Sequence, residues 1–143
     1  KNEIFQQAKN LAISQLLTGI IVTSLKFTTK VTRPDGTPHS FPSGHTSYAF
    51  TGATALYLEY KDSNPFIAYS GFGFSTATGM LRIINNRHWI SDVLVGAGVG
   101  MLTTKLTWYI NPFSNWKPFK NKNIAVYPYI DGFDQRAGLS FVF

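Results

Sequence analysis

The chain is organised around the stretch Arg82-Ile83-Ile84-Asn85-Asn86-Arg87-His88-Trp89-Ile90-Ser91-Asp92, which joins two apolar, glycine-rich segments. His88 and Asp92 are four residues apart, so a helix that begins near Trp89 brings the carboxylate within reach of the imidazole. A carboxylate that accepts the Nδ1 proton fixes the tautomer and leaves a lone pair on Nε2, and such a histidine can act as a base, metal ligand or nucleophile. Arg82 adds a fork of donors that suits phosphate oxygens. Taken alone, the stretch is also explained by a polar helix start and a solvated arginine.

Length and charge describe a single basic domain. The 143 residues include 13 Lys and Arg against 7 Asp and Glu, a formal net charge of +6. A chain of about 150 residues buries roughly two-thirds of its unfolded surface, so a core is available. Basic chains favour phosphorylated substrates, acidic lipid surfaces or nucleic acid. We expect no nucleic acid, because the sequence has no dense tract of Lys and Arg. The absence of cysteine excludes disulfides, thiolate metal sites and cysteine nucleophiles.

Helical periodicity predicts four helices, over residues 8–29, 43–60, 66–84 and 91–110. The segments 10–25 and 63–81 lack charge, but hydroxyl, amide, proline and glycine residues interrupt them. We therefore expect buried bundle helices rather than membrane spans, which need about 20 predominantly apolar residues. Gly96, Gly98 and Gly100 alternate along the last helix without the flanking features of a phosphate loop. We expect these glycines to allow close packing against the preceding helix.

The period of the pattern changes after residue 110. Residues 111–123 form a predicted linker, and residues 124–130 and 138–143 alternate like two strands around a turn. The predicted fold is therefore mainly α, a compact bundle of about four core helices with a short C-terminal β-hairpin. We expect one domain over residues 1–143, with the bundle at about 1–110 and the linker and hairpin at about 111–143.

Two loops before the central stretch carry further polar groups. Residues 31–41 form a predicted loop, with a turn at Arg33-Pro34-Asp35-Gly36. Pro42-Ser43-Gly44-His45 opens the second predicted helix, and the first backbone amides of a helix have no partner within it. These amides, with Gly44 allowing close approach, make an anion site. The alternative is an ordinary capped helix start with an exposed histidine.

Together these stretches resemble the three-part signature of the type 2 phosphatidic acid phosphatase (PAP2) family, which also contains bacterial acid phosphatases and vanadium-dependent haloperoxidases. The parts occur in order: Lys26, six residues, Arg33-Pro34; Pro42-Ser43-Gly44-His45; and Arg82, five residues, His88, three residues, Asp92. The match covers residues 26–92. Leu81 departs from the small residue that the family often has before the arginine, and we expect only a small effect on packing there.

The resemblance implies a metal-independent phosphatase with a phosphohistidine intermediate. His88 would attack phosphorus, Asp92 would orient His88, and His45 would protonate the leaving oxygen and later help to activate water. The residues that would bind the phosphate oxygens are Lys26, Arg33, Ser43, Gly44 and Arg82. Phosphoryl transfer depends on positioning and charge neutralisation, which three cations and helix-start amides can supply.

The implied substrates are lipid phosphates such as phosphatidate, phosphatidylglycerophosphate or a polyprenyl pyrophosphate, with small phosphate esters as an alternative. No cofactor is expected, with vanadate as an inhibitor or phosphate mimic. The histidines follow no zinc spacing and the arginines repel cations, so no metal is expected. Two other functions stay open: a vanadium-dependent haloperoxidase, and a non-catalytic domain that binds a membrane surface. The resemblance places the chain in the periplasm or on the extracytoplasmic face of a membrane, with membrane-surface association.

Overall fold

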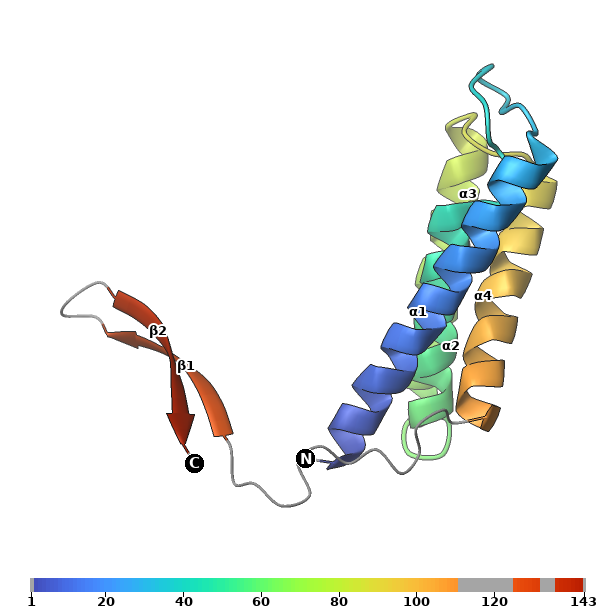
Figure 1. Ribbon diagram of the computed structural model, residues 1–143. Helices are drawn as coiled ribbons and strands as arrows, with labels where there is room; N and C mark the ends of the chain where they lie inside the picture. Colours follow the sequence, from blue (N-terminus) through green and yellow to red (C-terminus); the bar gives the residue numbers. More distant parts are fainter. Residues whose placement is uncertain (1, 111–124, 132–135, 143) are drawn as a thin grey trace.

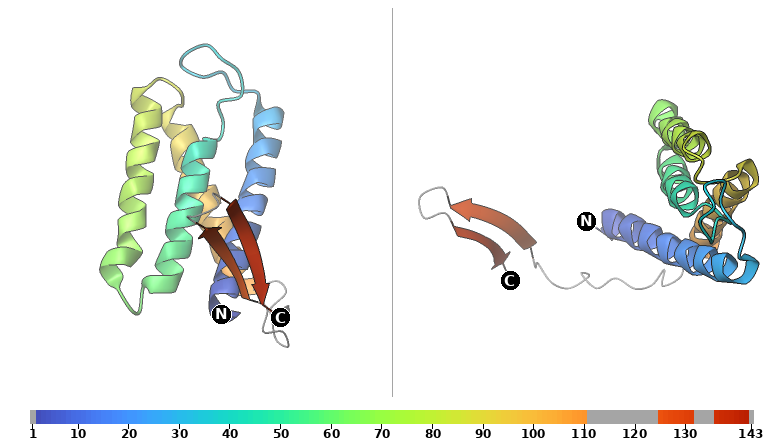
Figure 2. Two further views of the ribbon diagram at one scale, coloured as in Figure 1. Left: turned by 90° about the vertical axis from the view of Figure 1, so that its left-hand side faces the viewer. Right: turned by 90° about the horizontal axis from the view of Figure 1, so that it is seen from above.

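A computed structural model describes residues 2–110, 125–131 and 136–142. Its elements are α1 (Asn2–Thr29), α2 (Gly44–Tyr60), α3 (Pro65–Ile84), α4 (Ile90–Ile110), β1 (Ala125–Asp131) and β2 (Arg136–Val142). The four helices form one bundle (Figures 1 and 2), so the prediction of a mainly α bundle is confirmed. The first helix begins at Asn2 rather than at residue 8.

The two strands pair in antiparallel register, with Ala125 opposite Val142 and Asp131 opposite Arg136. The linker predicted over residues 111–123 lies outside the described residues. The contribution of the predicted hairpin to the fold stays a prediction.

α2 is the central helix of the bundle and packs against α1, α3 and α4, whereas α3 and α4 contact each other little. Figure 1 shows that the loop from α1 to α2 and the loop from α3 to α4 lie at the same end of the bundle. The α2–α3 turn lies at the opposite end, near the N-terminus. All three stretches of the signature are therefore brought to one end.

Glycines let α4 approach α2 closely. A Cβ on Gly96 would lie 2.7 Å from the carbonyl oxygen of Ser43, and one on Gly100 would lie 2.3 Å from that of Ser47. Nothing lies within 4 Å of a Cβ built on Gly98. The expectation that these glycines pack against the preceding helix is thus wrong. Residues 96 and 100 are four apart and share the face toward α2, while residue 98 lies on another face.

The interior of the bundle is rich in hydroxyl groups. Thr18 on α1 bonds through its Oγ1 to the hydroxyls of Thr51 at 2.9 Å and Thr103 at 2.6 Å, which joins α1, α2 and α4. The largest fully buried side chains are Thr18, Thr46, Thr51, Thr54, Thr104, Asp92, Pro42, Ser14, Ser40, Ser43 and Ser47. Large apolar side chains instead face outward on all four helices. Soluble proteins show the opposite preference inside.

Within the described part of the chain, two helices are long and apolar enough by length and composition to cross a membrane, Ile4–Thr29 and Ile90–Ile110, with mean hydropathies of 1.4 and 1.3. The structure buries only 17% and 33% of their apolar windows. Residues 10–25 lie in a bundle helix, as expected, but the expected burial is wrong. The same holds for residues 63–81, where Phe66 and Phe74 on α3 are 84% and 77% exposed. The polar residues that interrupt segment 10–25, such as Ser14 and Thr18, turn inward, while Leu16 and Ile20 face outward with 68% and 64% exposure.

Candidate active site

A pocket of about 310 Å³ opens at the end of the bundle where the three stretches meet. Helices α1 and α2 and the two loops at this end all contribute side chains to its wall. The lining residues are Val22, Thr23, Lys26, Arg33, Gly44, His45, Tyr48 and His88. Five of the eight predicted site residues thus line one pocket, and the other three, Ser43, Arg82 and Asp92, lie behind or beside it.

His88 is held by groups buried behind the pocket. Its Nδ1 lies 3.5 Å from Oδ2 of Asp92, and only 4% of the His88 side chain is exposed. Asp92 is fully buried, and its Oδ2 also accepts a hydrogen bond of 2.9 Å from the backbone amide of Trp89. This bond ties the carboxylate to the start of α4. Because Nδ1 faces Asp92, Nε2 is the nitrogen left for chemistry in the pocket.

Ser40 is a second buried partner that the sequence analysis missed. Its hydroxyl donates a hydrogen bond to Oδ2 of Asp92 and lies 3.4 Å from Nδ1 of His88. The Ser40 side chain is fully buried. No motif marks this serine. Its partners His88 and Asp92 lie 48 and 52 positions later in the sequence, and only the path of the loop before α2 brings Ser40 next to them.

Two cations, Lys26 and Arg33, line the pocket, and a third, Arg82, acts electrostatically on His45; none of the three has a carboxylate partner among the side chains that the structure describes. Lys26 donates instead to the carbonyl oxygens of His39 at 2.9 Å and Ser40 at 3.4 Å. The Nε atoms of Arg33 and Arg82 are buried and have no hydrogen-bond partner among the described residues. Leaving charged donors unsatisfied is costly. The arrangement therefore suits an anion with several oxygen acceptors.

The positive field acts on both histidines of the site. Burial lowers the pKa of His88 below its ordinary value of 6.5, and the charges of Lys26 and Arg33 lower it further, against the opposing effect of Asp92. Partial burial also lowers the pKa of His45, with Arg82 and Arg33 adding to the shift. Both rings are therefore neutral at pH 7 in the absence of a bound anion.

The start of α2 differs from the prediction at Ser43. The Ser43 amide donates to the carbonyl oxygen of Asp92 at 2.9 Å, and its hydroxyl bonds to Thr46 at 2.9 Å without capping the helix. Ser43 is fully buried, and its amide already donates to the Asp92 carbonyl. This amide is therefore not free to bind an anion. The expectation of three unpaired amides is wrong for this residue. Gly44 and His45 do line the pocket.

Polar contacts at the rim hold the two loops together. Arg87 forms an ion pair of 3.1 Å with Asp35, and the indole nitrogen of Trp89 donates to the carbonyl oxygen of Thr32 at 2.8 Å. Both contacts join the loop that carries Arg33 to the loop that carries His88. Their effect is to hold the loop of Arg33 at a fixed position relative to the loop of His88.

His39 lies outside the pocket and has a local role. Its Nδ1 lies 3.0 Å from the carbonyl oxygen of Lys26, and its ring contacts Phe27 with centroids 5.1 Å apart. It thereby satisfies a carbonyl in the last turn of α1. Among the described residues, no group of three or more His, Asp or Glu side chains is placed to hold a metal ion. The expectation of metal independence stays a prediction.

Comparison with known proteins agrees with this geometry. The sequence model of the PAP2 superfamily matches residues 35–116, more than half of the chain. This chain belongs to the PAP2 superfamily. The family resemblance predicted from the three stretches is thus confirmed, and the PAP2 chain has the expected signature at one pocket.

Two relatives show how the PAP2 chain compares with longer proteins. It is 45% identical over 101 residues to Lipid A 1-phosphatase of Porphyromonas gingivalis, which covers 70% of this chain and 23% of that protein. The crystal structure of Aquifex aeolicus LpxE superposes with a TM-score of 0.68 at 29% identity, covering 72% of this chain and 67% of that one. The chain thus spans about a quarter of the length of the Porphyromonas relative.

Proposed function

We propose that this PAP2 chain is a phosphatase that hydrolyses lipid phosphates through a phosphohistidine on His88. The observation that carries the proposal is the pocket itself. Lys26 and Arg33 line it without carboxylate partners among the described side chains, the buried Nε of Arg82 also lacks a partner there, and His88 is held in the pocket by Asp92. Such a site combines a nucleophile with the charge neutralisation that phosphoryl transfer requires.

The first step forms a phosphorus–nitrogen bond. Nε2 of neutral His88 attacks phosphorus while the bond to the ester oxygen breaks, and the three cations stabilise the charge on the equatorial oxygens. Asp92 and Ser40 keep the ring in place from behind. His45 donates a proton to the leaving oxygen, so the alcohol departs neutral.

The second step releases phosphate. Water attacks phosphorus as the bond to Nε2 breaks, and His45, now neutral, takes the proton from that water. The low pKa of His45 favours this basic role. A bound phosphate monoester is dianionic and offsets the positive charges of Arg82 and Arg33. It therefore raises the pKa of His45, so that His45 can carry the proton that the first step requires.

The proposed substrate is a membrane lipid phosphate acted on at the outer face of a membrane. The name of the Porphyromonas relative, Lipid A 1-phosphatase, adds lipid A to the lipid phosphates expected from the sequence. Helices Ile4–Thr29 and Ile90–Ile110, with outward apolar side chains, support insertion of α1 and α4 into the bilayer. The pocket then lies at headgroup level, on the periplasmic side. No observation favours the haloperoxidase or the purely binding function.

The C-terminal hairpin is an accessory part of this proposal, supported by the alternating pattern of residues 124–130 and 138–143. Removing residues 124–143 should leave phosphate release intact if the hairpin is accessory. Loss of folding in the shortened protein would instead place the hairpin in the core.

The test is phosphate release from lipid A, long-chain phosphatidate and an aryl phosphate, measured in excess EDTA. We expect phosphate release from at least one lipid, and a rate of release about 10³-fold or more lower in His88→Ala. His39→Ala is the matched control, because His39 lies outside the pocket, and it should keep its activity. Equal release by His88→Ala and the natural chain would contradict the proposal, and loss of activity in EDTA would contradict metal independence.

A further inference from the structure

A groove on the outer surface of α1 is continuous with the pocket. It has a volume of about 490 Å³ and is lined by Gln15, Leu16, Gly19, Ile20, Thr23, Ser24 and Tyr48. Thr23 and Tyr48 also line the pocket that contains His88. A molecule whose phosphate occupies the pocket can therefore extend into the groove without leaving the protein surface.

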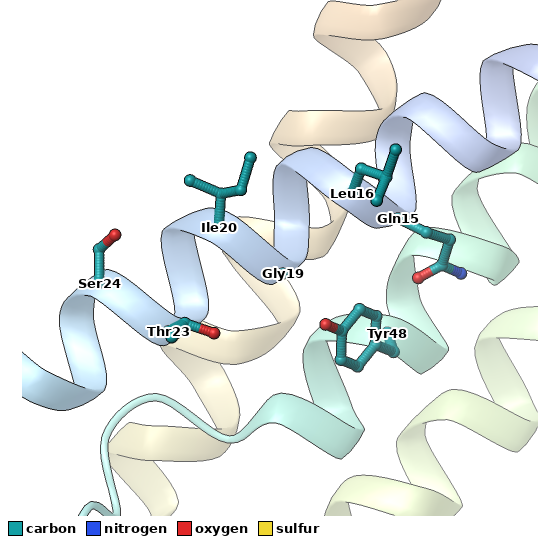
Figure 3. A pocket seen from close by; sticks show the side chains of 7 residues that line it. All are labelled: Gln15, Leu16, Gly19, Ile20, Thr23, Ser24 and Tyr48. Carbon is teal, nitrogen blue, oxygen red and sulfur yellow. The ribbon is translucent and has the colours of Figure 1, made fainter.

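The shape of the groove follows from residue spacing on α1. Side chains four residues apart form a ridge along a helix, and Leu16, Ile20 and Ser24 form one wall in this way. Figure 3 shows this ridge on one side of Gly19 and the ring of Tyr48 on the other. Gly19 keeps the floor low, because a Cβ there would lie only 2.6 Å from the Tyr48 hydroxyl oxygen.

The chemistry of the groove fits an acyl chain. Leu16 and Ile20 are 68% and 64% exposed and belong to the apolar helix Ile4–Thr29. From Gln15 to Ser24 the helix rises roughly 13.5 Å, so the groove has the length of a substantial part of a fatty chain.

We propose that this groove binds an acyl chain of the lipid phosphate whose headgroup occupies the catalytic pocket, with Tyr48 at the junction between chain and headgroup. The inference rests on the proposed function and deepens it, because it makes chain recognition a property of α1. The continuity of groove and pocket and the apolar ridge beside them support one extended ligand rather than two separate ones.

One test fills the floor of the groove. Gly19→Leu should lower the ratio of long-chain phosphatidate hydrolysis to aryl phosphate hydrolysis by about tenfold or more, because several methylenes lose their burial. Gly98→Leu is the matched control on α4, where nothing lies within 4 Å of the added Cβ, and its ratio should not change. An unchanged ratio in Gly19→Leu would overturn the inference.

A second test starts from folded protein and separates this inference from the proposed function. The chain has no cysteine, so Ile20→Cys and the control Leu94→Cys each give one thiol, at sites 64% and 67% exposed. Long-chain phosphatidate should slow alkyl-methanethiosulfonate labelling of Ile20→Cys and not of Leu94→Cys, and an aryl phosphate should slow neither. Equal protection of both thiols, or of neither, overturns the groove assignment whether or not the protein turns over. Absence of hydrolysis with selective protection would overturn only the proposed function.

Discussion

Gly44 is the residue at which phosphate binding is best separated from folding. A Cβ there would contact Val22 Cγ1 at 3.6 Å and Lys26 Cε at 4.0 Å, which are ordinary distances. We expect Gly44→Ala to fold normally, with an unfolding free energy unchanged or raised by up to about 1 kcal/mol. Its methyl group lies in the pocket, so kcat/KM should fall by about tenfold or more.

The control for Gly44→Ala is Gly52→Ala on the same helix, where the added methyl meets open space. Thermal unfolding of both variants tests the expected stability, and steady-state kinetics test the expected fall in kcat/KM. Equal kcat/KM for the two variants would show that the pocket does not approach a ligand at Gly44.

The lowered pKa of His88 makes stability depend on pH. In the unfolded chain, the His88 imidazole binds a proton when the pH falls below its ordinary pKa of 6.5. In the folded protein it binds a proton less readily, because burial and the nearby cations disfavour the charged imidazole. The unfolding free energy should therefore fall as pH decreases from about 7.5 to about 5.5. Denaturant unfolding in detergent measures it, and the slope should be smaller in His88→Gln. An unchanged slope in that variant would assign the pH dependence to other groups.

At the residue level, the sequence predicted His88, Asp92 and the three cations as site residues, because their spacing within each stretch is local. The structure places them as expected at one end of the bundle, and their roles remain proposals. Ser40 could not be predicted, since its contacts with His88 and Asp92 depend on the path of the whole loop. That the Ser43 amide is occupied could not be predicted for a similar reason, because its partner, the Asp92 carbonyl, lies on α4.

At the level of elements, the contact of α2 with α4 depends on which glycine faces inward. Gly100→Ala would drive a methyl group into the Ser47 carbonyl and should destabilise the protein by about 1–3 kcal/mol. Gly98→Ala faces open space and should be neutral or stabilising by up to about 1 kcal/mol. Chemical denaturation of the pair gives the comparison. Similar losses in both variants would contradict the packing of α4 against α2 described above.

Helical periodicity was sufficient to predict all four helices, and their ends within a few residues apart from the start of α1. It did not reveal which side of each helix faces inward. In segment 10–25 serines and threonines are interspersed with leucines and isoleucines, and we expected the segment as a whole to be buried. The structure buries Ser14 and Thr18 and exposes Leu16 and Ile20. The Thr18 hydroxyl bonds to Thr51 and Thr103 on the neighbouring helices. The Ser14 hydroxyl donates to the Asn10 carbonyl within α1.

On the scale of the whole molecule, a hydroxyl-lined interior and an apolar exterior meet at one polar, positively charged end. That distribution suits a bundle whose sides face lipid and whose site meets a headgroup. The groove beside α1 links the two environments. The central claim of this account is that the headgroup phosphate passes through a covalent bond to His88.

Trapping that intermediate is the most direct measurement. An aryl phosphate has a good leaving group that needs little protonation, so His45→Ala should still form the phosphohistidine but hydrolyse it slowly. Alkaline quenching followed by mass spectrometry should then locate one phosphate on His88, at higher occupancy in His45→Ala than in the natural chain. A phosphate found on another residue, or no adduct in a protein that releases phosphate from the same substrate, would contradict the account.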